Sequence, residues 1–137
     1  MISEKNRQLL SQLFRFALVG AIGFIVNALL VELLALYTGP VVAQLLAFPV
    51  AATSTWLMNR RFTFAATAPA SFSEWRKYLL ANTAGMVANN GFYFLTVLSS
   101  DFAYKHPVIG VAAGSVAGLF FNFVATRAYV FKARSDR

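Results

Sequence analysis

Two arginines stand at matching places in the chain, and each is followed at the same spacing by aromatic residues. Residues 59–64 read Asn-Arg-Arg-Phe-Thr-Phe, and residues 126–131 read Thr-Arg-Ala-Tyr-Val-Phe. The guanidinium groups of Arg60 and Arg127 could bind phosphate oxygens, because their planar N–H donors match that geometry. The alternative role is structural, since arginine at the cytoplasmic end of a membrane helix anchors the helix and sets its orientation. Arg61 has alanine as its counterpart, which favours anchoring.

Amide side chains within apolar segments form a second candidate set, because amides both donate to and accept from hydroxyl groups. Its members are Asn27, Asn82, Asn89 and Asn90. Asn27 and Asn89 could instead bond to each other. Glu32 is the acidic residue inside an apolar segment, which indicates proton coupling or cation binding. Solvation near the membrane surface, or pairing with Lys105, is the alternative for Glu32.

Four apolar segments contain or directly precede these side chains, and each is close to the roughly 20 residues that a membrane-spanning helix needs. The 137-residue chain is 58% hydrophobic and 12% charged, whereas soluble proteins average about 25% charged residues. The spans are expected at about 16–37, 41–58, 78–99 and 107–126, with a short surface helix before the first. The sequence therefore predicts an all-α integral membrane fold in a single domain, residues 1–137.

The basic residues are distributed unevenly around these spans. Eleven of the twelve Lys and Arg residues precede the first span, lie between the second and third, or follow the fourth. Lys105 alone lies on the other side. The positive-inside rule then places both termini and the central loop in the cytoplasm. The distribution of the basic residues thus explains the net charge of +7 by membrane topology and contact with membrane lipid. No nucleic-acid partner is expected.

The chain contains an internal repeat. A shift of 62 aligns the first span with the third, and a shift of 67 aligns the second with the fourth. The matched pairs include Arg15 with Lys77, Gly23 with Gly85, Asn27 with Asn89, Pro40 with Pro107, and Arg60 with Arg127. We expect two parallel two-helix repeats, about 15–64 and 77–131, with any binding site between them.

Small residues at intervals of four predict close helix packing within the membrane. They are Ala43, Ala47 and Ala51 in the second span, and Gly110, Gly114 and Gly118 in the fourth. Their packing partner could lie in the same chain or in a second copy. Because four short helices barely enclose a cavity, a homodimer or larger oligomer is expected.

The segment Arg15-Phe16-Ala17-Leu18-Val19-Gly20-Ala21, the four spans, Asn27 and residues 59–64 together resemble the GtrA-like family, over roughly residues 14–132. The resemblance implies a multi-pass protein of the bacterial inner membrane that acts in cell-surface polysaccharide synthesis. Such proteins are proposed to move a polyprenyl-phosphate-linked sugar across the membrane, or to assist a glycosyltransferase.

The resemblance gives the candidate residues specific roles. Arg60 and Arg127 would hold the lipid phosphate, with Arg15 and Lys77 as a second phosphate contact or only a charge belt. The four asparagines would contact the sugar hydroxyls. A non-transporting adaptor for a glycosyltransferase is the main alternative. A small multidrug exporter ranks last, because its glutamate is expected nearer the centre of the first span than Glu32 is.

An enzyme is not expected from this sequence. The chain has no cysteine, and no Ser/His/Asp set, carboxylate pair, phosphate loop or cluster of metal ligands is evident. His106 is a lone histidine in an expected turn. No cofactor and no metal are therefore predicted.

Overall fold

The computed structural model of the protein describes residues 1–106 and 108–131. Most of the described chain is helical and none of it forms a strand, so the predicted all-α class is confirmed. The chain divides into two compact units, Met1–Trp75 and Arg76–Arg137, which we call the first and second hairpin. The expected start of the fourth span at Pro107 and the basic residues 132–137 lie outside the described residues.

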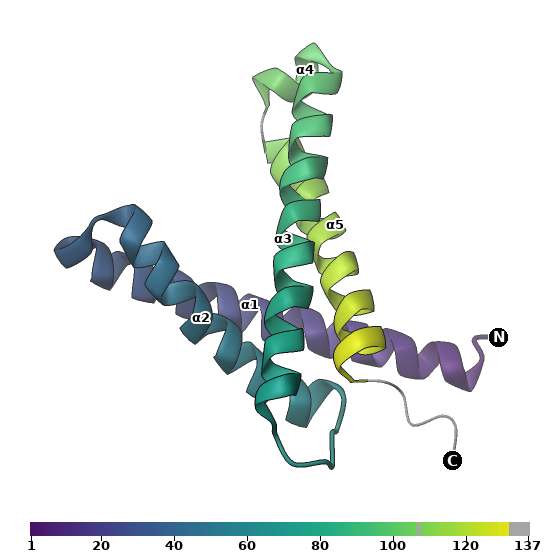
Figure 1. Cartoon of the computed structure of the whole chain (residues 1–137). Helices are drawn as coiled ribbons and strands as arrows, with labels where there is room; N and C mark the ends of the chain where they lie inside the picture. The colour runs from purple at the N-terminus through teal and green to yellow at the C-terminus, as the bar shows by residue number, and fades with distance from the viewer. Residues whose placement is uncertain (107, 132–137) are drawn as a thin grey trace. The chain divides into compact units, whose positions relative to one another are not determined.

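The first hairpin pairs two long helices, α1 (Glu4–Thr38) and α2 (Pro40–Met58), which run side by side (Figure 1). Gly39 is the single residue between them, and its φ of 80° is a conformation that favours glycine. The Ser3 side chain caps the start of α1 by accepting from the Asn6 N–H. The separate surface helix expected before residue 16 is wrong, because α1 runs unbroken for 35 residues.

Small residues bring α2 against α1. Ala43 and Ala47 are fully buried and Ala51 is 6% exposed, as their spacing predicts. Gly23 of α1 lies so close to α2 that an added Cβ would stand 2.2 Å from Thr55 Cγ2. A five-residue π-helix, η1 (Asn59–Thr63), continues α2 directly.

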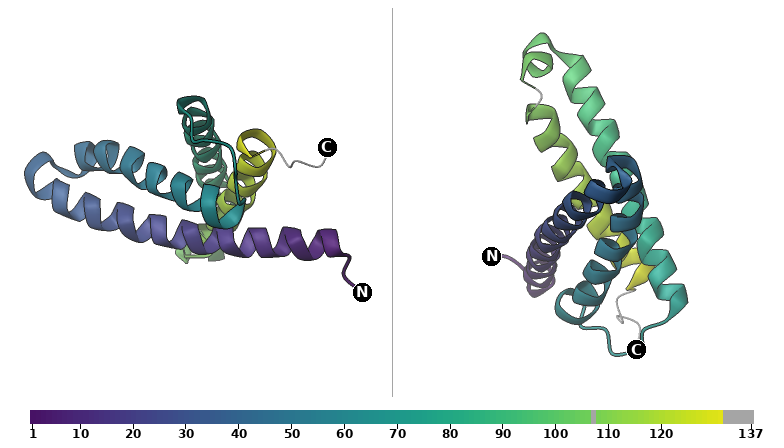
Figure 2. Two further views of the ribbon diagram at one scale, coloured as in Figure 1. Left: turned by 90° about the horizontal axis from the view of Figure 1, so that it is seen from below. Right: turned by 90° about the vertical axis from the view of Figure 1, so that its left-hand side faces the viewer.

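The second hairpin begins within α3 (Phe72–Ser99) and returns through α5 (Val108–Ala125), which ends in a second π-helix, η2 (Thr126–Val130) (Figure 2). The connection contains a short helix, α4 (Asp101–Lys105), where a simple turn was expected. Ser100 explains the helix, because its side chain accepts from the Ala103 N–H and so caps the first turn.

The glycine ridge of α5 packs against α3 of the same chain, which answers the question of its partner. A Cβ at Gly110 would lie 2.5 Å from Val97, and one at Gly114 would lie 2.5 Å from the backbone oxygen of Asn89. A Cβ at Gly118 would lie 3.0 Å from Asn89 Cβ. Glycine therefore permits the close approach of these two helices.

The outer surface of α1 is suited to lipid. Its most apolar 18-residue window has a mean hydropathy of 2.3, and only 11% of that window is buried. By length and composition α1 could cross a membrane, and no other helix in the described part of the chain passes the same test.

Candidate functional site

The π-helices give both hairpins the same closing turn. The Phe64 N–H donates to the Asn59 carbonyl, and the Phe131 N–H donates to the Thr126 carbonyl, each at 2.9 Å. These bonds span five residues instead of the four of an α-helix. Single π-turns are rare and occur frequently at functional sites. In each hairpin the second residue of this turn is an arginine, Arg60 or Arg127.

The first residues of the two turns differ in their side-chain contacts. In η1 the Thr63 hydroxyl donates to Asn59 Oδ1 at 2.7 Å, and Asn59 is only 1% exposed. In η2 the matching first residue, Thr126, is fully buried. Its Oγ1 has no hydrogen-bond partner among the described residues. The backbone geometry is therefore shared, whereas the polar side-chain contacts differ.

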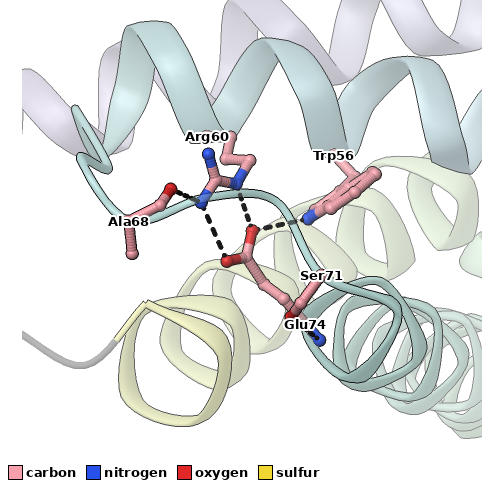
Figure 3. Close-up of polar contacts among 5 residues, drawn as sticks. All are labelled: Trp56, Arg60, Ala68, Ser71 and Glu74. Atoms are coloured by element: carbon pink, nitrogen blue, oxygen red, sulfur yellow. Dashed lines mark hydrogen bonds and ion pairs between the residues drawn. The ribbon is translucent and has the colours of Figure 1, made fainter.

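Arg60 forms a partly buried ion pair with Glu74, which lies at the start of α3 (Figure 3). Its Nε donates to Glu74 Oε1 at 2.5 Å, and its Nη2 donates to Oε2 at 3.1 Å. The indole N–H of Trp56 also donates to Oε1, at 2.8 Å. The side chains of Arg60 and Glu74 are 13% and 14% exposed. The predicted phosphate contact is thus bound to a carboxylate of its own chain.

The segment 65–71, between η1 and α3, makes defined contacts with η1. The Ala66 N–H donates to the Arg60 carbonyl at 2.8 Å, and Arg60 Nη2 makes a short hydrogen bond to the Ala68 carbonyl. Ser71 Oγ then accepts from the Glu74 N–H at 3.1 Å, which caps the first turn of α3. These contacts position Glu74 opposite Arg60.

Two further predicted cations lie beside the closing turns. Arg15 Nη1 donates to the Phe62 carbonyl at 3.2 Å. Lys77 Nζ lies 5.5 Å from the centre of the Tyr129 ring, within range of a cation–π interaction. Phe62 and Tyr129 are matched by the shift of 67, and Arg15 and Lys77 by the shift of 62. Each hairpin therefore brings a cation from its first helix to the same position of its π-helix.

A polar residue of the returning helix lies over a glycine of the first helix in both hairpins. Thr55 faces Gly23, and Asn122 Oδ1 lies only 1.7 Å from where a Cβ of Gly85 would stand. Asn122 is a polar residue that the sequence reasoning missed. The shift of 67 that aligns Thr55 with Asn122 is the signal that could have found it.

Asn27 contacts a residue that was not predicted. Its Nδ2 donates to Gln44 Oε1 across the first hairpin at 3.2 Å. Its Oδ1 is buried without a hydrogen-bond partner among the described residues. Gln44 was missed because only the register of α1 against α2 brings it opposite Asn27.

The other predicted asparagines lie along α3. Asn82 donates to the Tyr78 carbonyl at 2.9 Å, and Asn90 donates to the Met86 carbonyl at 3.1 Å. Both of these amides therefore bond to their own helix. Asn89 instead lies against the glycine ridge of α5.

Glu32 lies apart from the closing turns, on the exposed side of α1. It lines an open, shallow depression together with Leu29, Leu33, Ala35 and Leu36. No group of three His, Cys, Asp or Glu side chains in the described part of the chain could hold a metal ion. Glu32 is thus a single carboxylate on an apolar helix surface.

Comparison with protein families identifies the chain. Residues 15–131 match the family described as "GtrA/DPMS, transmembrane domain". Comparisons with curated proteins and with solved structures found no match. The matched region includes both π-helices and most of each hairpin, and it confirms the GtrA-like resemblance. The chain is therefore a membrane protein that belongs to the GtrA/DPMS transmembrane-domain family.

Proposed function

We propose that this protein translocates a polyprenyl-phosphate-linked sugar across the bacterial inner membrane for cell-surface polysaccharide synthesis. Membership of the GtrA/DPMS family is consistent with a role in synthesis that uses polyprenyl-linked sugars. In this proposal four helices span the membrane, both termini are cytoplasmic, and the protein acts as a homodimer or larger oligomer. It is assigned no catalytic step.

The recurrence of the closing turn carries the proposal. Both hairpins end in a π-helix with arginine at its second position, and both place a cation from the first helix beside that turn. We infer that the two hairpins are parallel repeats, residues 15–64 and 77–131. Parallel repeats present equivalent groups to the same side of the membrane. Two equivalent cationic turns at one membrane surface suit a ligand with an anionic head.

The phosphate is assigned to Arg60 and Arg127, with Arg15 and Lys77 nearby. Charge-assisted hydrogen bonds from guanidinium to phosphate are about twice as strong as neutral ones. The ion pair with Glu74 supports this assignment, because it demonstrates that the Arg60 fork can bind two anionic oxygens at once.

The sugar is assigned to amides deeper in the helices, while the polyprenyl tail stays in lipid. The candidates are Asn27, Asn82, Asn89 and Asn90. Asn27 has a buried oxygen with no partner among the described residues, so it could accept from a sugar hydroxyl. Glu32 is assigned to coupling with protons or cations, because a carboxylate on a membrane helix is a functional candidate.

The direct test is leaflet exchange in reconstituted vesicles. Purified protein is incorporated with a fluorescent polyprenyl-phosphate sugar, and its movement between leaflets is measured by quenching from outside. We expect protein-dependent exchange that falls at least about tenfold in the Arg60→Gln, Arg127→Gln double variant, because the phosphate loses both charged contacts. Arg61→Gln, an exposed neighbour, is the matched control. Absence of exchange by folded wild-type protein would exclude translocation.

An adaptor for a glycosyltransferase is the second candidate. The segment 65–71 favours it, because its contacts with Arg60 would present an ordered surface to a partner. In that case a glycosyltransferase should co-purify with the wild type and be lost when this segment is replaced by glycine and serine. Co-purification in the absence of any leaflet exchange would favour the adaptor over the translocator.

A further inference from the structure

The Glu74 carboxylate accepts hydrogen bonds from three N–H groups that converge where α2 continues into η1. Trp56 Nε1 and Arg60 Nε donate to one carboxylate oxygen, and Arg60 Nη2 donates to the other (Figure 3). We call these three donors the Trp56–Arg60 cradle. Trp56 is 8% exposed, and the Arg60 and Glu74 side chains are 13% and 14% exposed. The cradle is thus a sheltered anion site whose occupant comes from the chain itself.

The cradle would accept phosphate as well as carboxylate. A guanidinium fork binds two oxygens of either group in the same planar arrangement, and the indole N–H adds a third donor. The two anions would repel each other and would need the same donor hydrogens. Occupancy by Glu74 and occupancy by a phosphate therefore exclude each other.

Glu74 is placed so that it could leave without disturbing the paired helices. It is the third residue of α3 and follows the irregular segment 65–71. The Ser71 cap is the side-chain contact that fixes its backbone N–H. Because helix ends open at lower free energy than paired helices do, unwinding the first turn of α3 would carry Glu74 off the cradle.

We propose that Glu74 is a tethered competitor for the phosphate of the transported lipid at the Trp56–Arg60 cradle. This inference rests on the proposed function, which places a lipid phosphate on Arg60. The apparent affinity of a ligand falls in proportion to the fraction of protein in the competent state. Glu74 thereby weakens phosphate binding in the first hairpin and makes its release easier.

Binding of farnesyl phosphate, a short prenyl phosphate, tests the proposal in the full chain in lipid nanodiscs. Trp56 and Trp75 are the two tryptophans, so a Trp75→Phe parent leaves Trp56 as the fluorescent reporter within the cradle. Because this change also removes the hydrogen bond from Trp75 Nε1 to Thr53 Oγ1 at 2.8 Å, every variant is compared with this parent. Glu74→Gln keeps the side-chain length and an acceptor oxygen but removes the charge. We expect it to tighten binding at least about tenfold. Adding Arg60→Gln should abolish the gain.

A second variant leaves every charge in place. Ser71→Ala removes the cap that holds the first turn of α3, so Glu74 should leave the cradle more often. We expect a smaller gain of about threefold to fivefold in affinity. Glu4→Gln is the matched control, because its carboxylate is exposed and, among the residues that the structure describes, forms a single long ion pair of 3.9 Å with Arg7. It should leave the affinity unchanged.

Two results would overturn the proposal while leaving the phosphate contact intact. One is unchanged or weaker binding in both Glu74→Gln and Ser71→Ala, with Arg60→Gln still reducing the affinity of the parent. The other is an equal gain for farnesol, which lacks the phosphate. If Arg60→Gln has no effect in any background, the phosphate role of Arg60 in the proposed function also fails. An equal gain with inorganic phosphate supports recognition of the phosphate group itself.

Discussion

The first and second hairpins share a closing turn, yet they stabilise it differently. In the first, Asn59 bonds to Thr63 and Arg60 bonds to Glu74. In the second, Thr126 carries a buried hydroxyl without a partner among the described residues, and Val130 stands where Thr63 would. Both hairpins nevertheless keep the same π-type backbone bond. The comparison indicates that helix packing sets the turn and that the polar contacts can change around it.

The hairpins also differ in how closely their helices approach. Ala43, Ala47 and Ala51 form the ridge of α2, whereas glycines form the ridge of α5. Glycine allows the backbone of α3 to lie directly against α5. Close approach of the helix backbones therefore distinguishes the packing of the second hairpin.

Removing the Glu74 carboxylate should have the largest effect on stability. Glu74→Ala leaves the partly buried Arg60 charge without its carboxylate, which should cost about 3 kcal/mol, the low end of the penalty for breaking a buried pair. We expect a lower midpoint of thermal unfolding, followed by circular dichroism in detergent micelles. Glu4→Ala breaks an exposed pair and should change stability by no more than about 1 kcal/mol. Similar losses in both variants would contradict the distinction between the two ion pairs.

Adding a methyl group at the close helix contact of Gly114 should have the next largest effect on stability. Gly114→Ala introduces the residue found at the matching position, Ala47, but its Cβ would lie 2.5 Å from the Asn89 carbonyl oxygen. Because that neighbour is backbone, the helices must separate, at a cost of about 1–3 kcal/mol. Gly20→Ala, with nothing within 4 Å of its Cβ, is the control and should be neutral or slightly stabilising. If Gly114→Ala leaves stability unchanged, the second hairpin tolerates the helix separation that alanine requires, as the first hairpin does.

The smallest effect should come from making the first turn resemble the second. Thr63→Val removes the hydroxyl that bonds to Asn59 and leaves the buried Asn59 oxygen without this donor. We expect a loss of about 1 kcal/mol in the free energy of unfolding. Asn59→Thr combined with Thr63→Val reproduces the residues of η2 at both positions. Recovery of stability in the double variant would confirm that the contact, and not either residue alone, stabilises η1.

The sequence predicted the all-α class, the matched positions of Arg60 and Arg127, and the packing role of the small residues. It could not predict the π-helices, because no residue type distinguishes a bond over five residues from one over four. It could not pair Glu74 with Arg60, since that contact depends on how residues 65–71 fold back. Gln44 and Asn122 were missed for a related reason, because their neighbours depend on helix register.

The hydrogen bond from Arg15 to Phe62 has a geometric consequence for the membrane. It marks the point along α1 where the returning helix, α2 with η1, ends. From there to Thr38, α1 rises roughly 35 Å at about 1.5 Å per residue, slightly more than the roughly 30 Å hydrocarbon core of a bilayer. The turns of α1 before Arg15 extend past η1 (Figure 2). The paired part is therefore long enough to cross the hydrocarbon core. If it does so, the turns of α1 before Arg15 would lie outside the core and would tilt as local bilayer thickness changes.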